Sequence, residues 1–183
     1  FDLAGISKSP AIFDPQKLLH INSEYIRAMA PEQFHKAALP YISSAVPEGM
    51  DTVLIASLLH QRCEKLTDIP AQLDFFKELP EYSIELYTNK KSKTDSAVSL
   101  EMLNATLPIL EAIEDWTMDN IHEALINYAT EHEFKNAKVL WPVRIAMAGK
   151  TVTPGGAFEI AYLLGKDEAL ARMRKGIEML SAN

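Results

Sequence analysis

The stretch from Trp141 to Ala169, WPVRIAMAGKTVTPGGAFEIAYLLGKDEA, contains two short apolar segments, each followed by a glycine. These glycines are Gly149 and Gly165, and a glycine just beyond the last apolar residue is typical of a helix C-terminus. The pattern predicts one helix that ends at Gly149 and a second that runs from Pro154 to Gly165. Five of the seven glycines lie after residue 148, so this part of the chain should consist of short helices with sharp ends.

Apolar residues recur at helical spacing along most of the remaining chain, and no alternating strand pattern lasts beyond a few residues. The polar stretch YTNKKSKTDS, residues 87–96, has no apolar periodicity and is the best candidate for a boundary between subdomains. The predicted fold class is all-α, in two small helical subdomains. Helices are expected at residues 17–29, 31–42, 51–66, 96–113, 117–132 and 167–182, with a short one around TDIPAQLDFF.

The composition is that of an ordinary globular chain: 183 residues, 48% apolar and 23% charged. No window approaches the length of about 18 apolar residues that a membrane span requires. We expect no secretion leader, and the single cysteine, Cys63, excludes an internal disulfide and fits a reducing compartment. Because the chain starts at Phe1 without a methionine, we expect it to be a fragment of a longer protein.

Charge is unevenly distributed along the chain, whose formal net charge is −7. Residues 134–183 carry eight Lys/Arg and four Asp/Glu, whereas residues 1–133 carry ten and 21. Such asymmetry suggests a polyanionic partner at the basic end. Helix surfaces also collect Lys and Arg for solubility, and charge alone favours this second explanation.

Arg62 does not fit the helix predicted for residues 51–66. At ~100° per residue it lies only ~20° from Ile55, inside the apolar face. A buried, unpaired guanidinium is costly, so Arg62 should reach water, pair with a carboxylate, or bind an anionic or polar ligand. Taken alone, this residue favours a solvent-reaching or ion-paired arginine.

Arg144 is the second exception. With Pro142 in a first helical turn, Arg144 would lie near the positive end of the helix dipole. Alternatively, the helix begins near Asn136 and is kinked by Pro142, which places Arg144 at the edge of the apolar face. In both arrangements its planar fork suits a phosphate or a base edge.

The third exception is the segment TVTPGG. Thr153 can cap a helix and Pro154 suits its first position, but Gly155 and Gly156 each cost ~1 kcal/mol there relative to alanine. Bare backbone amides accessible to a flat or anionic group are one explanation. A tight inter-helix turn that requires small residues is the other, and the two are evenly balanced.

Catalytic and metal-binding signatures are absent. The five histidines, at positions 20, 35, 60, 122 and 132, show no metal-ligand spacing. There is no phosphate-binding glycine loop and no Gly-x-Ser-x-Gly motif. The sequence therefore predicts a binding or structural segment with neither catalytic residues nor a metal site.

Four stretches resemble one family. They are FDLAGISKSPAIFDPQKLLHINSEYIR (1–27), LLHQRCEKLTDIP (58–70), WPVRIAMAGKTVTPGG (141–156) and YLLGKDEALARMRK (162–175). In this order, and from Phe1 almost to the end, they are similar to the C-terminal anticodon-binding region of bacterial glutamyl-tRNA synthetases.

The resemblance implies that the two subdomains form an α-helical cage around a tRNA anticodon loop. It implies that Arg62 contacts the first anticodon base and Arg144 the third. It places Thr153, Pro154 and Gly155 against the middle base. All three exceptions to the helical pattern would then belong to one RNA-binding surface.

The same resemblance implies a division into a connector from a missing catalytic half (1–22), a first anticodon-binding subdomain (23–90) and a second, C-terminal one (91–183). The parent would be a cytoplasmic, monomeric glutamate–tRNA ligase that uses ATP with magnesium and glutamate. Its partner would be the tRNA for glutamate, with no membrane contact. This fragment, without a cofactor of its own, should not aminoacylate tRNA.

Lys150 and Lys166 are further candidates, as phosphate contacts, whereas Arg172 and Lys175 are expected on the solvated face of the last helix. The sequence departs from the family pattern at two positions. His20 replaces the usual tryptophan, and Gly156 is an extra residue, so that contacts after Gly155 cannot be transferred.

Two other functions compete with RNA binding. The first is a helical protein-interaction module of the same ancestry, which predicts an exposed apolar patch rather than a basic cleft. The second is a small-molecule-binding helical enzyme, disfavoured by the lack of clustered His and carboxylates. Within the ligase interpretation, Arg62 favours an enzyme specific for glutamate over one that also charges the tRNA for glutamine.

Overall fold

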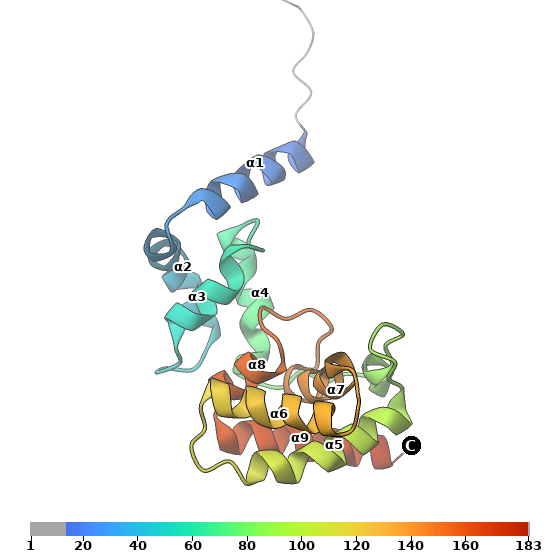
Figure 1. Ribbon diagram of the computed structural model, residues 1–183. Coiled ribbons are helices and arrows are strands. Elements are labelled where there is room, and N and C mark those ends of the chain that lie inside the picture. The colour runs from blue at the N-terminus through green and yellow to red at the C-terminus, as the bar shows by residue number, and fades with distance from the viewer. Residues whose placement is uncertain (1–13, 183) are drawn as a thin grey trace, which may run out of the picture.

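A computed structural model describes residues 14–182 of the chain, so the first 13 residues of the predicted connector, and of the family-like stretch 1–27, lie outside the described residues. Within this range there are nine α-helices, short 3-10 turns and one isolated antiparallel bridge, Asn89–Thr94 (Figure 1). The predicted all-α class is confirmed. The α-helices are α1 (Pro15–Ala28), α2 (Pro31–Ala45), α3 (Thr52–His60), α4 (Ile69–Leu73), α5 (Ser96–Glu111), α6 (Met118–Glu131), α7 (Asn136–Ala148), α8 (Ala157–Leu164) and α9 (Lys166–Ser181). The 3-10 turns are η2 (Leu66–Asp68), η3 (Asp74–Phe76) and η4 (Ile84–Tyr87).

The helices form two groups that lie one above the other in Figure 1. In the upper group α2 packs against α3 and α4, and in the lower group α5 to α9 pack against one another. The 3-10 turn η4 contacts α5 and α7, so its contacts are with the lower group although it precedes residue 90. Helix α1 runs without interruption across residue 22, the predicted end of the connector.

Side-chain caps define the starts of several helices. In each case a carboxylate or hydroxyl oxygen accepts hydrogen bonds from backbone amides that the first helical turn leaves free. The capping residues are Asp14 for α1, Asp51 for α3, Asp95 for α5 and Thr117 for α6. Asp95 directly precedes the helix predicted for residues 96–113, and Thr117 is the first residue of the one predicted for 117–132.

Two predicted helix boundaries are wrong. α3 ends at His60 rather than Leu66, and the next amide, that of Arg62, donates to the carbonyl of Leu59 at 2.9 Å in a tight turn. Arg62 is therefore exposed on a turn and does not lie within an apolar helix face. α8 begins at Ala157 rather than Pro154, because the two preceding glycines weaken a first helical turn.

Helix α7 is the centre of the lower group. It contacts α5, α6, α8, α9 and η4, and seven of its 13 residues are buried. Pro142 lies inside it, so the helix that starts at Asn136 is the correct one of the two predicted arrangements. Gly149 ends α7 in the left-handed conformation (φ 61°), as its position predicts. Arg144 is only half-buried, between the buried Val143 and Ile145, and is thus held by a rigid scaffold.

A buried arginine links the two groups. Nη1 of Arg172, on α9, donates to the carbonyls of Phe75 (2.7 Å) and Met147 (2.8 Å), and Nε pairs with Glu168 at 2.6 Å. The prediction that Arg172 lies on a solvated face is wrong, because only 3% of the residue is exposed. Lys175 is exposed, as predicted. None of the helices within residues 14–182 combines the length and apolarity that crossing a bilayer requires.

Candidate functional site

The guanidinium of Arg144 is held in place by three contacts. Nη1 donates to the hydroxyl of Thr153 at 3.1 Å, and Nη2 donates to the carbonyl of Thr151 at 3.1 Å. The charged group also lies over the ring of Trp141, 4.7 Å from its centroid, in a cation–π arrangement. A guanidinium has five N–H donors, so the remaining ones stay available to a ligand while the fork is fixed.

The Thr153–Gly155 turn is tied to this arginine. The Thr153 hydroxyl accepts from Arg144 and donates to the carbonyl of Gly155 at 2.7 Å. Thr153 and Pro154 are buried, and Gly155 is half-buried. The turn is therefore rigid and keeps a fixed position relative to Arg144.

The two glycines of this turn have different surroundings. A Cβ on Gly155 would lie 3.0 Å from Cβ of Glu159 and 3.1 Å from Cδ1 of Leu58 on α3, so close packing between the two helix groups favours glycine there. The amide of Gly156 donates to Glu159 at 3.0 Å. One amide of the turn is thus capped by the chain itself, and tight packing accounts for Gly155 without a ligand.

Side chains from α1 hold the turn that carries Arg62. The Asn22 side-chain amide donates to the carbonyl of Glu64, and Nε of Arg27 donates to the carbonyl of Gln61 at 3.2 Å. These two carbonyls lie on either side of Arg62. The Arg62 side chain extends from this anchored backbone into solvent.

Arg62 and Arg144 lie close enough to interact electrostatically although they come from different helix groups. Burial, and secondarily the positive charge of Arg62, lower the pKa of the Arg144 guanidinium. Neither guanidinium has a carboxylate partner within the described residues. Folding therefore creates a local positive surface on a chain whose net charge is negative.

A cavity of about 250 Å³ opens beside Arg144. It is bounded by the polar loop before α5, the N-terminal half of α7 and the start of α8. Its lining residues are Ser92, Ala137, Leu140, Trp141, Arg144, Gly156, Ala157 and Phe158. The cavity combines aromatic rings with one cationic fork, which are the groups that hold an unstacked base.

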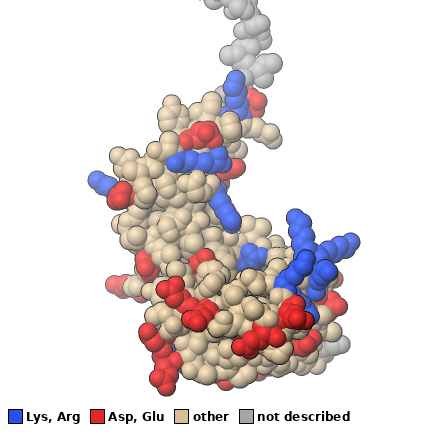
Figure 2. Space-filling view, in the orientation of Figure 1, with Lys and Arg blue, Asp and Glu red and all other residues tan. Residues whose placement is uncertain are grey.

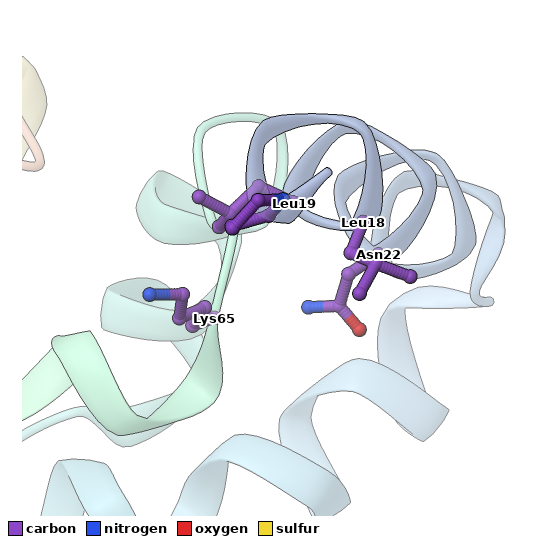
Figure 3. A pocket seen from close by; sticks show the side chains of 5 residues that line it. Leu18, Leu19, Asn22 and Lys65 are labelled. Carbon is purple, nitrogen blue, oxygen red and sulfur yellow. The ribbon is translucent and has the colours of Figure 1, made fainter. Parts of the chain in front are cut away.

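A second cavity, of about 410 Å³, lies between α1 and the turn after α3, and Figure 3 shows Leu18 and Asn22 of α1 together with Lys65 of the turn. Pro15 and Leu19 complete its lining. Its walls are mainly apolar and it contains no fixed guanidinium. This cavity is connected to the site through Asn22, which lines it and also donates to the carbonyl of Glu64 in the turn that carries Arg62.

The ammonium groups of the two candidate lysines have partners within the protein. Lys150 Nζ pairs with Asp74 and donates to the carbonyl of Ala71 at 3.0 Å, which joins the loop after α7 to the upper group. Lys166 Nζ donates to the carbonyls of Glu111 (2.8 Å) and Ile113 (2.6 Å) at the end of α5. These contacts account for both residues without a phosphate, and their contact with RNA stays a prediction.

Several site residues were not found from the sequence. Asn22 and Arg27 act across long sequence separations, Glu159 acts within a turn, and Trp141 contacts Arg144 one helical turn further along α7. No residue pattern marked any of the four. No cluster of three or more His, Cys, Asp or Glu side chains suited to a metal ion occurs between residues 14 and 182.

Comparisons with known proteins identify the family of this chain. A family model described as "Anticodon binding domain" matches residues 33–177, and the chain belongs to this family. Among curated proteins, it is 52% identical over 180 residues to a glutamate–tRNA ligase of Clostridium tetani, covering 98% of this chain and 37% of that protein. It is also 52% identical over 182 residues to a glutamate–tRNA ligase of Clostridium botulinum strain Hall, covering 100% of this chain and 38% of that protein.

Solved structures show the same fold. A glutamate tRNA ligase from Elizabethkingia meningosepticum, in complex with its amino acid, superposes with a TM-score of 0.76 at 24% identity. The superposition covers 98% of this chain and 35% of that one. The glutamate-tRNA synthetase of Elizabethkingia anophelis gives a TM-score of 0.72 at 24% identity, over 97% and 34% of the two chains. The chain thus spans little more than a third of the length of the relatives it matches.

Proposed function

We propose that this chain is the anticodon-binding part of a glutamate–tRNA ligase. The observation that carries the proposal is that Arg62 and Arg144, two guanidinium groups without carboxylate partners in the described chain, lie near the junction of the two helix groups. Arg144 is bonded to Thr153, and the neighbouring Gly155 packs close to Leu58, four residues before Arg62. The family match and the identity to glutamate–tRNA ligases support the same function. The alternative, an interaction module without RNA binding, has no comparable support.

In this proposal the anticodon bases are read as unstacked single-stranded bases. Arg62 hydrogen-bonds the first base and Arg144 the third, while Thr153, Pro154 and Gly155 form a wall against the middle base. Because Arg144 is fixed by Thr153 and by the Thr151 carbonyl before RNA arrives, little side-chain entropy is lost on binding. Each correct arginine–base pair should contribute ~1–3 kcal/mol of discrimination.

The proposal also states which part of the complete ligase binds the anticodon and which part carries out the chemical reaction. The aminoacylation chemistry, with ATP, magnesium and glutamate, would be carried out by the part of the ligase outside these 183 residues. The domain limits 1–22, 23–90 and 91–183, a monomeric state and a cytoplasmic location are proposed with it. The tRNA for glutamate is the proposed partner.

The proposal can be tested by fluorescence anisotropy with labelled anticodon stem-loops. The RNAs carry the glutamate anticodon or a single change at its first or third base. We expect Arg62→Ala to lose discrimination at the first base by about 5- to 150-fold, and Arg144→Ala to lose it at the third. Arg174→Ala, which removes an exposed arginine on α9, should leave both ratios unchanged.

Two results would contradict this function. One is the absence of binding to the glutamate stem-loop by the unaltered chain. The other is an equal loss of affinity for matched and altered anticodons in both arginine variants.

A further inference from the structure

The loop between η4 and α5 contains three lysines within four residues: Lys90, Lys91 and Lys93. All three are exposed. Within the described chain, none of their ammonium groups has a carboxylate or other hydrogen-bonding partner. Three neighbouring positive charges without counter-charges repel one another, so this cluster does not stabilise the folded loop.

The backbone of this loop is fixed. Asn89 and Thr94 exchange two backbone hydrogen bonds of 2.9 and 3.1 Å, and the Asn89 side chain accepts from the amide of Ser92 at 3.0 Å. The Thr94 hydroxyl donates to the carbonyl of Tyr87 at 2.8 Å. Lys93 has a positive φ of 56°, a conformation that the surrounding hydrogen bonds maintain.

Buried and exposed residues alternate along the loop. Ser92 and Thr94 are only 7% and 4% exposed, and the Thr94 hydroxyl ties the loop to the carbonyl of Tyr87 at the end of η4. The lysines beside them therefore project outward from a rigid base. Such a loop presents cationic groups at fixed positions, unlike a flexible basic tail.

The loop lies next to the proposed base-reading site. Ser92 lines the same cavity as Trp141 and Arg144, so the lysines on either side of Ser92 stand at the rim of this cavity. Figure 2 shows the densest group of basic side chains on the visible face of the molecule at the right, over the place where Figure 1 shows this loop beside α7. A strand of RNA with one base in the cavity would carry its phosphates past this rim.

We propose that Lys90, Lys91 and Lys93 form a phosphate-binding rim for the RNA backbone adjoining the base held at Arg144. This inference rests on the proposed anticodon-binding function and adds a second kind of contact to the same site. Lysine suits this task because its ammonium is a compact point charge that neutralises phosphate without reading sequence. The rim supplies affinity, whereas the two arginines supply selectivity.

The test measures binding of the 183-residue chain to the labelled glutamate anticodon stem-loop at salt concentrations from about 50 to about 200 mM. The variant carries Lys90→Gln, Lys91→Gln and Lys93→Gln together. Its matched control carries Lys17→Gln, Lys36→Gln and Lys175→Gln, which removes the same charge from exposed lysines on α1, α2 and α9. Far-UV circular dichroism and thermal melting verify that both variants are folded.

We expect the rim variant to bind about tenfold more weakly at low salt, with a log–log salt slope shallower by about 2 to 3, since each lost phosphate contact removes ~0.7–0.9 from it. The loss should be the same for RNAs with altered anticodons. The control triple should change the affinity by less than about threefold.

The outcomes separate the two proposals. If the unaltered chain binds and discriminates anticodons but the rim variant keeps its affinity and slope, the rim is wrong and the anticodon function stands. The rim is also wrong if the control triple loses as much affinity as the rim variant. If the unaltered chain does not bind the stem-loop, the anticodon function fails and the rim fails with it.

Discussion

Substitution of the buried Arg172 tests how the two helix groups are held together. Its side chain is 4% exposed, and Nη1 bridges two backbone carbonyls that belong to η3 and to the end of α7. Arg172→Met keeps much of the apolar stem but removes the charge and all three hydrogen bonds. The carbonyls of Phe75 and Met147 are then left without this donor.

The magnitude follows from those contacts. Each buried carbonyl that loses its hydrogen-bond donor lowers the stability by about 1–3 kcal/mol. Part of this loss is offset, because the folded variant no longer has to keep a charged guanidinium away from water. Glu168 is 52% exposed and regains water, so its loss adds little. We therefore expect the free energy of unfolding to fall by about 3 kcal/mol.

Arg174→Met is the matched control. Arg174 is on the same helix and makes an ion pair of the same length, 2.6 Å, with Glu111, but the two side chains are 52% and 41% exposed. An exposed pair of this kind contributes about 0–1 kcal/mol. Urea unfolding followed by circular dichroism measures both variants. Equal losses of stability in the two would refute the argument that burial makes the Arg172 bonds important.

Three further predictions concern single residues. Gly176→Ala should lower the free energy of unfolding by about 1–3 kcal/mol, because the added Cβ overlaps the hydroxyl of the buried Tyr87. Urea titrations measure this change, and a gain in stability would contradict the prediction. Burial raises the pKa of the Cys63 thiol to about 11, with an acidic neighbour adding to the shift. Mass spectrometry should therefore show alkylation at pH ~8 that is about 100-fold slower in the folded than in the unfolded chain, and comparable rates would be inconsistent with this pKa. Between pH 9.0 and about 11, the thiol loses its proton in the unfolded chain but keeps it in the folded chain. The contribution of this thiol to the free energy of unfolding is therefore fully present below pH 9.0 and is lost as the pH rises from 9.0 to about 11. Asn22→Ala should accelerate amide hydrogen exchange in residues 61–66, because the carbonyl of Glu64 loses its side-chain donor, and unchanged exchange would show that α1 does not hold this turn.

Helix positions were largely predictable because apolar periodicity and caps act locally. Asp95, Thr117 and Gly149 mark helix ends through hydrogen bonds or φ angles within a few residues, so the sequence pattern contains the relevant physics. The two wrong boundaries, after His60 and before Ala157, lie at turns that are held by contacts between residues far apart in the sequence. Side chains of α1, far away in sequence, hold the first of these turns.

The candidate site was only partly predictable. Arg62 and Arg144 were identified because they are exceptions to the helical pattern, although the reason given for Arg62 is wrong, since it lies on a turn. Arg172 shows the opposite error, because its position on an amphipathic helix indicated solvent while a long-range pair of carbonyls buries it. The cluster of Lys90, Lys91 and Lys93 was not found from the sequence, because net charge was compared only between residues 1–133 and 134–183, and these lysines fall in the acidic 1–133 part.

By itself, the sequence determined the all-α class, most helix starts and the family, because these depend on the order and spacing of residues along the chain. Only the tertiary structure decided that Arg62, Arg144 and the Thr153 turn meet at one junction, and that a polar loop expected to be a boundary stands beside them with its lysines exposed. The physical reason is distance: hydrogen bonds within a helix join residues about four apart, whereas the site is made by packing and charge between groups separated by dozens of residues.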